Sequence, residues 1–401
     1  MDSVLLFFYR SPVFARTTLA NMKFPQLLSL LLVSLAAVHA APISHDEVVS
    51  NAAKGLRLLS LSEGADPVWK TPDEVLDLMR AGTKFFDVTE VFEDQKDWVK
   101  PEGKVMKSVE AFPTPSHQTS VKSIISTLST SNMNSNLASL TAFNNRYYKS
   151  STGASASTFI QSKVQSYIDT YSRSDVTVSL FSHSWVQSSI IAKIPGSTPS
   201  NPIVIVGAHM DSINLSNPTS GRAPGADDDG TGTVNLLETF RALLAAGFKP
   251  TSPVEFHWYS GEEAGLLGSQ AIATNYKNAG KKLKAFMELD MSGYFKPGSK
   301  EVIALEADYI SADLNTFLRA LAAAYSTLPV TMDTPCGYAC SDHASWYNAG
   351  YATSFPYEAV TGNDDPQIHS AGDTTSVSGF SWTHSLEFTK LAVGFVYELA
   401  I

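Results

Sequence analysis

Three adjacent aspartates, Asp227, Asp228 and Asp229, stand in the stretch GRAPGADDDGTG at residues 221–232. Aspartate and glycine are common in surface turns, so a solvated turn is one interpretation. Here, however, the apolar run IVIVGAH precedes the stretch and the amphipathic pattern VNLLETFRALLAAG follows it at once. Carboxylates between a buried strand and a helix need a partner of opposite charge, which predicts a bound cation.

His209 and Asp211 end the same apolar run, which reads IVIVGAHMD. Because they are two residues apart in an extended chain, both side chains project from the same face. A metal-bound imidazole usually donates its second N–H to a carboxylate, and Asp211 is placed to accept it. A lone histidine at a strand end is usually an ordinary polar residue, and the His-x-Asp pairing makes a metal ligand an equally good interpretation.

Further acidic residues follow two other apolar runs. Glu262 and Glu263 come after VEFHWY, where adjacent residues point to opposite sides, so one can bind a metal while the other carries a proton. Paired glutamates are also common on solvated helices, but a position after an apolar strand disfavours that reading. Asp290 follows a third strand in MELDMSGY, and His369 lies in the late loop DPQIHSAGD.

Together, two histidines and three carboxylates form a set that suits two zinc ions. With one carboxylate shared, each ion receives three protein ligands. Two zinc ions with a bridging hydroxide and three carboxylates also balance in charge. One aspartate of ADDDG would be the bridge.

Alternating strands and helices from about residue 111 onward would hold these side chains. The expected strands lie in SLFSHSWVQSSIIAKIPG, PIVIVGAHMD, PVEFHWYSGEE, LKAFMELDMSGY and KEVIALEAD, and a helix is expected at residues 233–246. Such near-continuous apolar strands indicate a mostly parallel sheet covered on both faces. Ligands bind beyond the carboxyl ends of strands in such sheets, where all these candidate residues stand.

The first 110 residues predict processed segments. From Met22 the chain reads MKFPQLLSLLLVSLAAVHA, whose apolar run is shorter than the roughly 20 residues of a membrane span and ends in small residues. We therefore expect residues 1–40 to comprise an N-terminal extension and a cleaved secretory signal, with either Met1 or Met22 as the true start. A buried helix is the alternative, but no polar face interrupts the run.

Residues 41–110 are rich in charge and contain one clear helix signal, TPDEVLDLMRAG. After a signal peptide, such a segment suggests a propeptide that inhibits the enzyme or assists its folding. The alternative is a small N-terminal subdomain that stays. Residues 111–401 would then form the catalytic domain.

Composition and cysteine count limit the kinds of function and of metal site that the chain can have. The 401 residues carry a formal net charge of −10, which argues against a nucleic-acid binder. The two cysteines, Cys336 and Cys340, are close enough for a disulfide in a secreted chain, and a lone C-x3-C lacks the other ligands of a zinc site. Asn214 begins a glycosylation sequon.

The motifs GAHMDS, APGADDDGTG, SGEEAGLLGS, ELDMSGY, CGYACSDHASW and DDPQIHSAGDT, with FNNRYYKSSTG upstream, occur in a characteristic order. In this order and spacing the chain resembles the co-catalytic dizinc aminopeptidases, and within them the secreted fungal leucine aminopeptidases. The resemblance implies a single three-layer α/β domain whose mixed, mostly parallel central sheet is covered by helices on both faces. It also implies a monomer that acts on peptides with a free N-terminus, away from membranes.

The resemblance also assigns the metal ligands. It makes Asp228 the bridge between two Zn²⁺ ions. Glu263 and His369 would complete one site, and His209 and Asp290 the other.

Three further side chains receive roles in the same way. Glu262 would be the general base that takes a proton from the attacking water and returns it to the leaving amine, and Asp211 would orient His209. Tyr338, inside the disulfide loop, would hydrogen-bond the reacting carbonyl oxygen. The apolar pocket for the first side chain, Leu or Phe by preference, would be lined by Met291, Phe355, Tyr357 and Ile368.

Some features leave other functions open. Thr361 and Asp364 stand where bacterial relatives have aromatic residues, which makes the Leu preference less secure than the catalysis. A glutaminyl cyclase or a carboxypeptidase would share the fold, although a carboxypeptidase needs an arginine that no motif supplies. A non-catalytic binding ectodomain should have lost ligands, and all five are present. No G-x-S-x-G suggests a serine hydrolase, and GTGTVN lacks the third glycine of a dinucleotide site.

Overall fold

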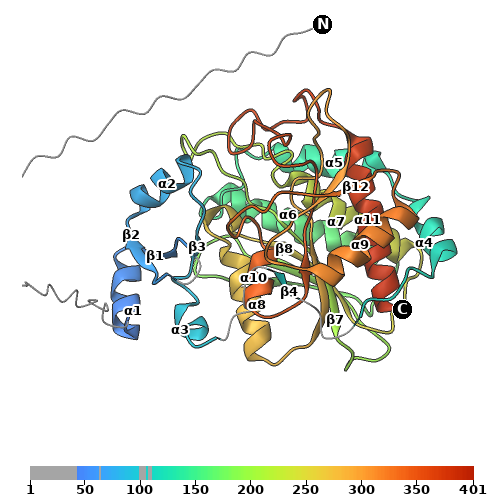
Figure 1. Cartoon of the computed structure of the whole chain (residues 1–401), viewed down its shortest axis with the longest axis horizontal. Coiled ribbons are helices and arrows are strands. Elements are labelled where there is room, and N and C mark those ends of the chain that lie inside the picture. Colours follow the sequence, from blue (N-terminus) through green and yellow to red (C-terminus); the bar gives the residue numbers. More distant parts are fainter. Residues whose placement is uncertain (1–42, 63–64, 99–104, 107–110) are drawn as a thin grey trace, which may run out of the picture. The chain divides into compact units, whose positions relative to one another are not determined.

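The computed structural model describes residues 43–62, 65–98, 105–106 and 111–401, and a six-stranded sheet lies at its centre (Figure 1). The strand order is β13-β9-β7-β8-β6-β5. Four neighbouring strands run parallel, namely β13 (Thr353–Ser354), β9 (Leu283–Glu288), β7 (Ile203–His209) and β8 (Val254–Tyr259). Two antiparallel strands, β6 (Ser189–Ile194) and β5 (Thr177–Phe181), complete one edge. The sheet is mixed and mostly parallel, as predicted.

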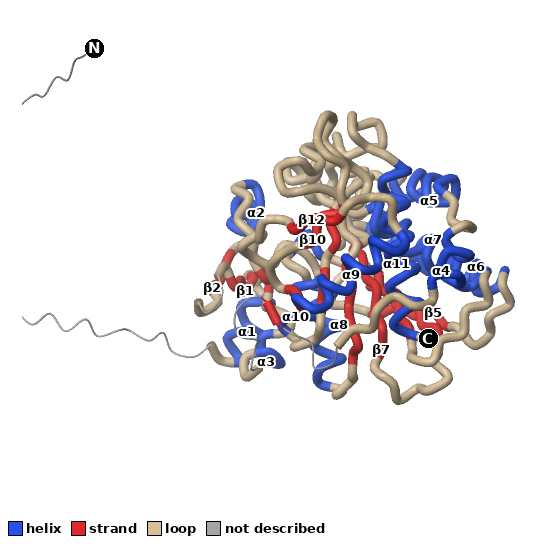
Figure 2. Tube along the Cα trace, turned by 45° about the vertical axis from the view of Figure 1, so that its right-hand side comes forward, coloured by secondary structure: helices blue, strands red, loops and turns tan. Residues whose placement is uncertain are grey.

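Helices cover both faces of this sheet, because alternate residues of each strand point to opposite sides. Val204 and Val206 of β7 join a cluster with residues of α4 (Gln118–Ile125), α5 (Thr130–Thr141), α6 (Ser151–Thr170), α7 (Gly230–Ala245), α9 (Ala312–Tyr325) and α11 (Trp382–Ala400). Ile205, between them, faces a second cluster with residues of α8 (Leu267–Asn278) and α10 (His343–Asn348). Figure 2 shows the red strands of the sheet among these blue helices. The predicted three-layer α/β fold is confirmed.

A smaller sheet stands apart from the central one, with the order β12-β10-β14. It consists of β12 (Val330–Met332), β10 (Ile303–Leu305) and β14 (Pro356–Tyr357). The strand expected in KEVIALEAD is β10, so it exists but does not extend the main sheet. Its apolar residues predict a strand without specifying its partners, and those partners lie 25 or more residues away in the chain.

The described residues before 111 form α1 (His45–Ala53), β1 (Arg57–Ser60), β2 (Val68–Lys70), α2 (Pro72–Arg80), β3 (Phe86–Asp87), α3 (Phe92–Gln95) and β4 (Val105–Met106). The predicted helix is α2. The Thr71 side chain accepts the Glu74 N–H, the Glu74 side chain accepts the Thr71 N–H, and Gly82 takes a positive φ just beyond the end. The signal segment and Met22 lie outside the described residues.

This N-terminal segment packs against the part of the chain that follows. The Asp87 N–H donates to the Gly265 carbonyl at 3.2 Å, and Gln270 of α8 donates to the Asp87 carbonyl at 3.1 Å. β4 also runs parallel to β11 (Ile310–Ser311). The contacts suit either a removed or a retained segment, and the expected processing point near residue 110 lies outside the described residues. Within the described ranges, no helix has both the length and the apolar character that crossing a membrane requires.

Candidate metal centre

The carboxyl ends of three parallel strands bring the candidate ligands together. His209 is the last residue of β7, Glu262 and Glu263 lie in the 3₁₀ turn η1 (Glu262–Ala264) after β8, and Asp290 follows β9 by two residues. The in-register pairing of His209 with Tyr259 places the ends of β7 and β8 at the same level of the sheet. Two loops complete the site, one before α7 with Asp228 and one before α11 with His369.

Asp228 belongs to two groups of potential ligands at once. His209, Asp228 and Asp290 offer atoms within 4.8 Å of one another, and Asp228, Glu263 and His369 do the same. Oδ1 of Asp228 lies 3.1 Å from His209 Nε2, whereas Oδ2 lies 3.1 Å from His369 Nε2. The two oxygens of one carboxylate therefore face two different histidines, which is the arrangement expected of a bridging ligand.

The donor atoms fit metal ions better than they fit each other. Within the described part of the chain, His209 Nε2, Glu263 Oε1 and Asp290 Oδ1 are buried and find no hydrogen-bond partner. Leaving buried polar atoms unpaired is costly unless another ligand satisfies them. Imidazole nitrogens with carboxylate oxygens are a donor set that zinc accepts. The residues thus fit two neighbouring metal ions.

An excess of carboxylates shapes the electrostatics of this site. Burial raises the pKa of Glu262 well above its usual value; the positive charge of His209 opposes the rise, and Asp342 and Glu263 add to it. Burial alone would lower the pKa of His209, but Asp290 and the neighbouring carboxylates outweigh it and raise the pKa. The raised pKa of His209 reports an excess of negative charge around it, which bound cations would offset.

Asp211 contacts the glutamate turn more closely than it contacts the histidine. Its two carboxylate oxygens accept the Glu262 N–H at 3.0 Å and the Glu263 N–H at 3.3 Å. Oδ1 lies 3.6 Å from His209 Nδ1, which is longer than a hydrogen bond. Asp211 therefore fixes the backbone of η1 in addition to facing His209.

The other two aspartates of ADDDG shape the loop. Asp229 caps α7 by accepting the Gly232 N–H at 2.8 Å, and it also accepts the Met291 N–H at 3.1 Å. Asp227 accepts the Gly293 N–H at 2.8 Å. The peptide bond between Asp228 and Asp229 is cis. These contacts tie the loop before α7 to the segment that follows β9, and so fix Asp228 relative to Asp290.

Three supporting residues were not identified from the sequence. Asp373 accepts the N–H groups of Asp227 and Asp228 at 2.8 and 3.1 Å. Ser341 donates to Asp290 Oδ2 at 2.7 Å. Arg146, which is 1% exposed, donates to the carbonyls of Met210 and Gly225 at 2.7 and 2.8 Å and to that of Pro224. All three lie within the motifs FNNRYYKSSTG, CGYACSDHASW and DDPQIHSAGDT, which are the signals that could have identified them.

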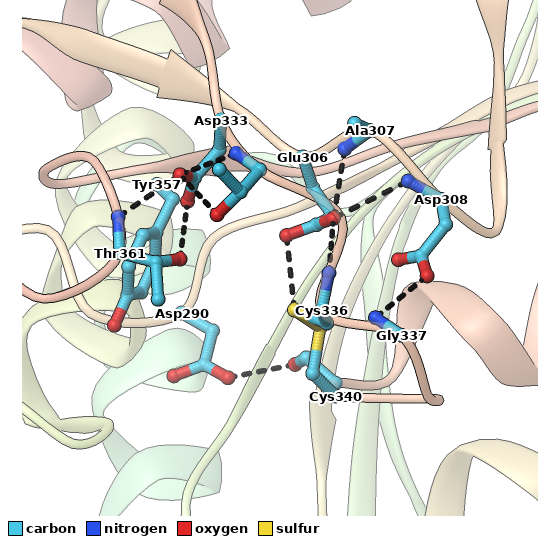
Figure 3. The surroundings of a disulfide bond; sticks show 12 residues. Asp290, Glu306, Ala307, Asp308, Asp333, Cys336, Gly337, Cys340, Tyr357 and Thr361 are labelled. Carbon is cyan, nitrogen blue, oxygen red and sulfur yellow. Dashed lines mark hydrogen bonds between the residues drawn. A yellow bond between two sulfur atoms is a disulfide. The ribbon is translucent and has the colours of Figure 1, made fainter. Parts of the chain in front are cut away.

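The expected disulfide between Cys336 and Cys340 is present (Figure 3). Tyr338 is the middle residue of the loop that it closes. The Tyr338 side chain is partly buried. Burial raises the pKa of its hydroxyl, and nearby Lys84 opposes this rise. The tyrosine thus stays a neutral hydrogen-bond donor near neutral pH.

Lys84, from the N-terminal segment, is the least expected residue at this site. Its Nζ lies 5.6 Å from the centre of the Tyr338 ring. Burial would lower the pKa of Lys84, but Tyr338 and the carboxylates of Glu262, Glu263 and Asp228 raise it. A cleft is lined by Glu262, Glu263 and His369 together with Met79, Thr83, Lys84 and Phe85 of the N-terminal segment. The N-terminal segment therefore forms a wall of the cleft at the candidate centre.

Among the four expected pocket residues, Tyr357 contacts both Met291 and Phe355. Tyr357 Oη lies 3.4 Å from Met291 Sδ, and the rings of Phe355 and Tyr357 are 5.5 Å apart. Ile368 is partly exposed beside His369. Near Tyr357, Thr361 donates its N–H and hydroxyl to Asp333 at 2.9 and 2.8 Å (Figure 3). Thr361 is therefore held by a buried carboxylate.

Asn214 is partly buried, and its side chain is already engaged. Nδ2 donates to the Arg222 carbonyl at 2.8 Å, and Oδ1 accepts the Ser216 N–H at 2.9 Å. Glycosylation at this position stays a prediction.

Comparisons with known proteins agree with this geometry. Residues 189–396 match the model of peptidase family M28. The chain is 43% identical over 354 residues to Probable leucine aminopeptidase 1 of Trichophyton verrucosum, with 86% of this chain and 92% of that protein covered. It is 41% identical over 396 residues to Leucine aminopeptidase 1 of Paracoccidioides brasiliensis, with 94% and 99% covered. The crystal structure of LapA aminopeptidase from Legionella pneumophila superimposes with a TM-score of 0.75 at 29% identity and covers 87% of this chain and 96% of that chain.

Proposed function

The chain belongs to peptidase family M28, a family of metal-dependent hydrolases, and from this premise we propose that it is a secreted zinc aminopeptidase. It removes the N-terminal residue, preferably Leu or another apolar residue, from peptides. Glu262 would act as the general base of the hydrolysis, beside two zinc ions that the neighbouring side chains would hold. The observation that carries the proposal is Asp228, whose two oxygens face His209 and His369.

Five side chains would hold the ions, four of them binding one ion each and one binding both. His209 and Asp290 would bind one ion, Glu263 and His369 the other, and Asp228 both. Zinc bound there would lower the pKa of a shared water towards neutrality and polarise the scissile carbonyl.

Glu262 is placed for proton transfer rather than for binding a metal. Its Oε2 lies 3.9 Å from His209 Nε2, farther than the ligand carboxylates, and its backbone N–H is held by Asp211. Glu262 accepts the proton of the attacking water and returns it to the leaving amine.

Tyr338 would stabilise the developing negative charge on the carbonyl oxygen by donating its hydroxyl proton in a hydrogen bond. Its aromatic ring lies near Lys84 in the same cleft. The free amine of the substrate would face the carboxylates of this site, so that cleavage stops after one residue. Met291, Phe355, Tyr357 and Ile368 would contact the first side chain.

Two alternatives remain to be distinguished by experiment. A glutaminyl cyclase or carboxypeptidase could use the same fold, and a non-catalytic binding ectodomain could keep it without activity. Relatives above 40% identity over most of the chain carry the name leucine aminopeptidase, which favours the proposal.

The decisive experiment compares the wild type with Glu262→Gln for zinc content and for hydrolysis of leucyl anilide. We expect two zinc ions per chain in both proteins and a loss of kcat of about 10³-fold or more in the variant, because general base catalysis typically contributes 10²–10⁴-fold. A variant that retains both ions and the wild-type rate would refute the role of Glu262. One zinc per chain would refute the two-metal proposal. A preference for lysyl or glutamyl anilides would refute the preference for apolar residues.

We further propose that residues 41–110 are a propeptide that inhibits the precursor, and that Lys84 contributes by occupying the cleft with its positive charge. Its Nζ lies 5.6 Å from the centre of the Tyr338 ring, and the carboxylates of Glu262, Glu263 and Asp228 raise its pKa. The full chain is produced in a secreting host, and the uncleaved and cleaved forms are identified by N-terminal sequencing. A mature start near residue 111 is expected.

In the uncleaved form, Lys84→Met should raise leucyl anilidase activity at least several-fold, because the cleft loses a charged occupant. After cleavage the variant and the wild type should be equal, since the segment has left. Lys54→Met is the matched control, since Lys54 is exposed and contacts only Asn51 among the hydrogen bonds found for its side chain. An uncleaved wild type as active as the cleaved enzyme would contradict an inhibitory role.

A further inference from the structure

The disulfide loop that carries Tyr338 is anchored by two buried acidic residues. Glu306 Oε1 accepts the Cys336 N–H at 3.1 Å, and Asp308 Oδ2 accepts the Gly337 N–H at 2.9 Å. The exposed fractions of Glu306 and Asp308 are 1% and 2%. Figure 3 shows both side chains reaching from one strand end to the start of the loop. The two residues just before Tyr338 therefore have their backbone positions fixed by side chains 29 and 30 residues away.

The two oxygens of Glu306 have different surroundings. Oε1 also accepts the N–H groups of Ala307 and Asp308, at 2.8 and 3.2 Å, so it acts as a carbonyl-type acceptor. Oε2 lies 3.0 Å from Cys336 Sγ. A disulfide sulfur has no hydrogen, so the proton of such a contact must come from the carboxyl group. Burial, together with nearby Asp308, raises the pKa of Glu306 to about 7, in keeping with a neutral carboxyl group.

Glu306 is itself held by a rigid support. It directly follows β10, and its N–H donates to the Phe355 carbonyl at 2.9 Å. The Leu305 carbonyl accepts the Asp333 N–H at 2.8 Å, close to where the chain leaves β12 towards the loop. Beyond the loop, Ser341 binds the proposed ligand Asp290. The loop is thus fixed at its start by the small sheet and at its end by the metal centre.

We propose that Glu306 is a positioning residue for Tyr338, which it serves by holding the Cys336 backbone. The inference rests on the proposed function, in which Tyr338 donates a hydrogen bond to the carbonyl oxygen of the substrate. Without the Glu306 acceptor, the start of the loop loses one of the two side-chain contacts that hold its backbone. The hydroxyl of Tyr338 then spends less time where the oxyanion forms, and displacements of about 1 Å can cost 10²-fold in rate.

A double-mutant cycle tests this inference with the full chain, cleaved in the same way for every protein. Tyr338→Phe should lower kcat by about 10²-fold, in the range for removing one oxyanion donor. Glu306→Met should lower kcat about tenfold and leave KM within about twofold. In the Tyr338→Phe background, Glu306→Met should add less than about twofold, because two mutations that act through one group are not additive.

The conservative variant separates positioning from general stability. Glu306→Gln keeps a carbonyl oxygen for the three N–H groups and places an N–H towards the sulfur, so its kcat should stay within about twofold of the wild type. Asp308→Ala removes the acceptor of the Gly337 N–H. Its effect on kcat should be smaller in the Tyr338→Phe background than in the wild type, as for Glu306→Met. If Glu306→Met proves too unstable to purify, this variant carries the cycle.

Glu387→Met is the matched control. Glu387 is also buried and accepts a backbone N–H, that of Thr327 at 2.8 Å, but it lies on α11. Glu387→Met should change kcat by the same factor in the wild type and in the Tyr338→Phe background.

Two results would overturn the positioning role. One is a tenfold loss from Glu306→Met that persists in the Tyr338→Phe background, and the other is an equal loss in Glu306→Gln and Glu306→Met. If Tyr338→Phe alone left kcat unchanged, the proposed role of Tyr338 would fail instead, so the two failures are distinguishable.

Discussion

Glu306 shows how one buried side chain makes stability depend on pH. Its pKa rises from 4.5 to about 7 on folding, chiefly through burial. The folded state therefore binds this proton more tightly than the unfolded state does. The resulting stabilisation is complete below pH 4.5 and is lost as the pH rises through 7.

Glutamine cannot titrate, so Glu306→Gln should escape this loss. Relative to the variant, we expect the wild type to lose stability between about pH 4.5 and 7, by up to about 3 kcal/mol. Urea unfolding of both proteins at pH 5 and pH 8 measures the difference. Glu387→Gln is a control of opposite sign, because hydrogen bonds from Lys390 and Thr327 outweigh burial and lower the pKa of Glu387. A gap between wild type and Glu306→Gln that is the same at both pH values would contradict the prediction.

At the scale of elements, Arg146 joins the end of β7 to the loop that carries Asp228. Its guanidinium donates to carbonyls on both sides, at Met210 and at Gly225, with Asp373, Asp229 and Asp211 nearby as negative charges. The strand end supplies His209, so this side chain links the two segments that carry His209 and Asp228.

Arg146→Met should therefore destabilise the fold by about 3–5 kcal/mol, since it strands buried carbonyls and removes a compensating charge. Thermal unfolding and zinc content measure the effect, and both should fall. Arg173→Met provides a comparison, because Arg173 is also buried and binds the Phe248 carbonyl at 2.8 Å but contacts none of the proposed ligands. Its zinc content should stay normal, and equal zinc loss in both variants would argue against a local role for Arg146.

The elements that could be predicted are those whose signals are local. β7, β8 and β9 were identified from apolar runs, and the ligands at their ends from polar residues that interrupt those runs. The partners of β10 could not be identified, because three apolar residues do not specify a sheet. The roles of Arg146 and Lys84 could not be predicted for a similar reason, because their partners lie far away in the chain and leave no periodic pattern.

At the scale of the whole molecule, bound metal should contribute to folding stability. The ligands come from β7, η1, the segment after β9 and two loops, so the unfolded chain cannot assemble the same site. A ligand at 100 times its dissociation constant adds about 2.7 kcal/mol to the stability of the folded state.

Removal of zinc with a chelator should therefore abolish leucyl anilide hydrolysis and lower the melting temperature by several degrees. Returning zinc should restore both, whereas magnesium, which prefers oxygen ligands, should not. Differential scanning calorimetry and activity assays on the same samples measure this. An unchanged melting temperature after complete metal loss would contradict the prediction.

The uncleaved chain is a tether that links Lys84 and the rest of the N-terminal segment to the cleft. In the uncleaved chain the N-terminal segment meets its cleft at an effective concentration of the order of millimolar, whatever the protein concentration outside. A single cut near residue 110 changes none of the contacts of Lys84, Asp87 or Gln95, but it makes them bimolecular. If residues 41–110 are the proposed propeptide, dilution after secretion would then release the segment, and activation would require only one broken peptide bond and a larger volume.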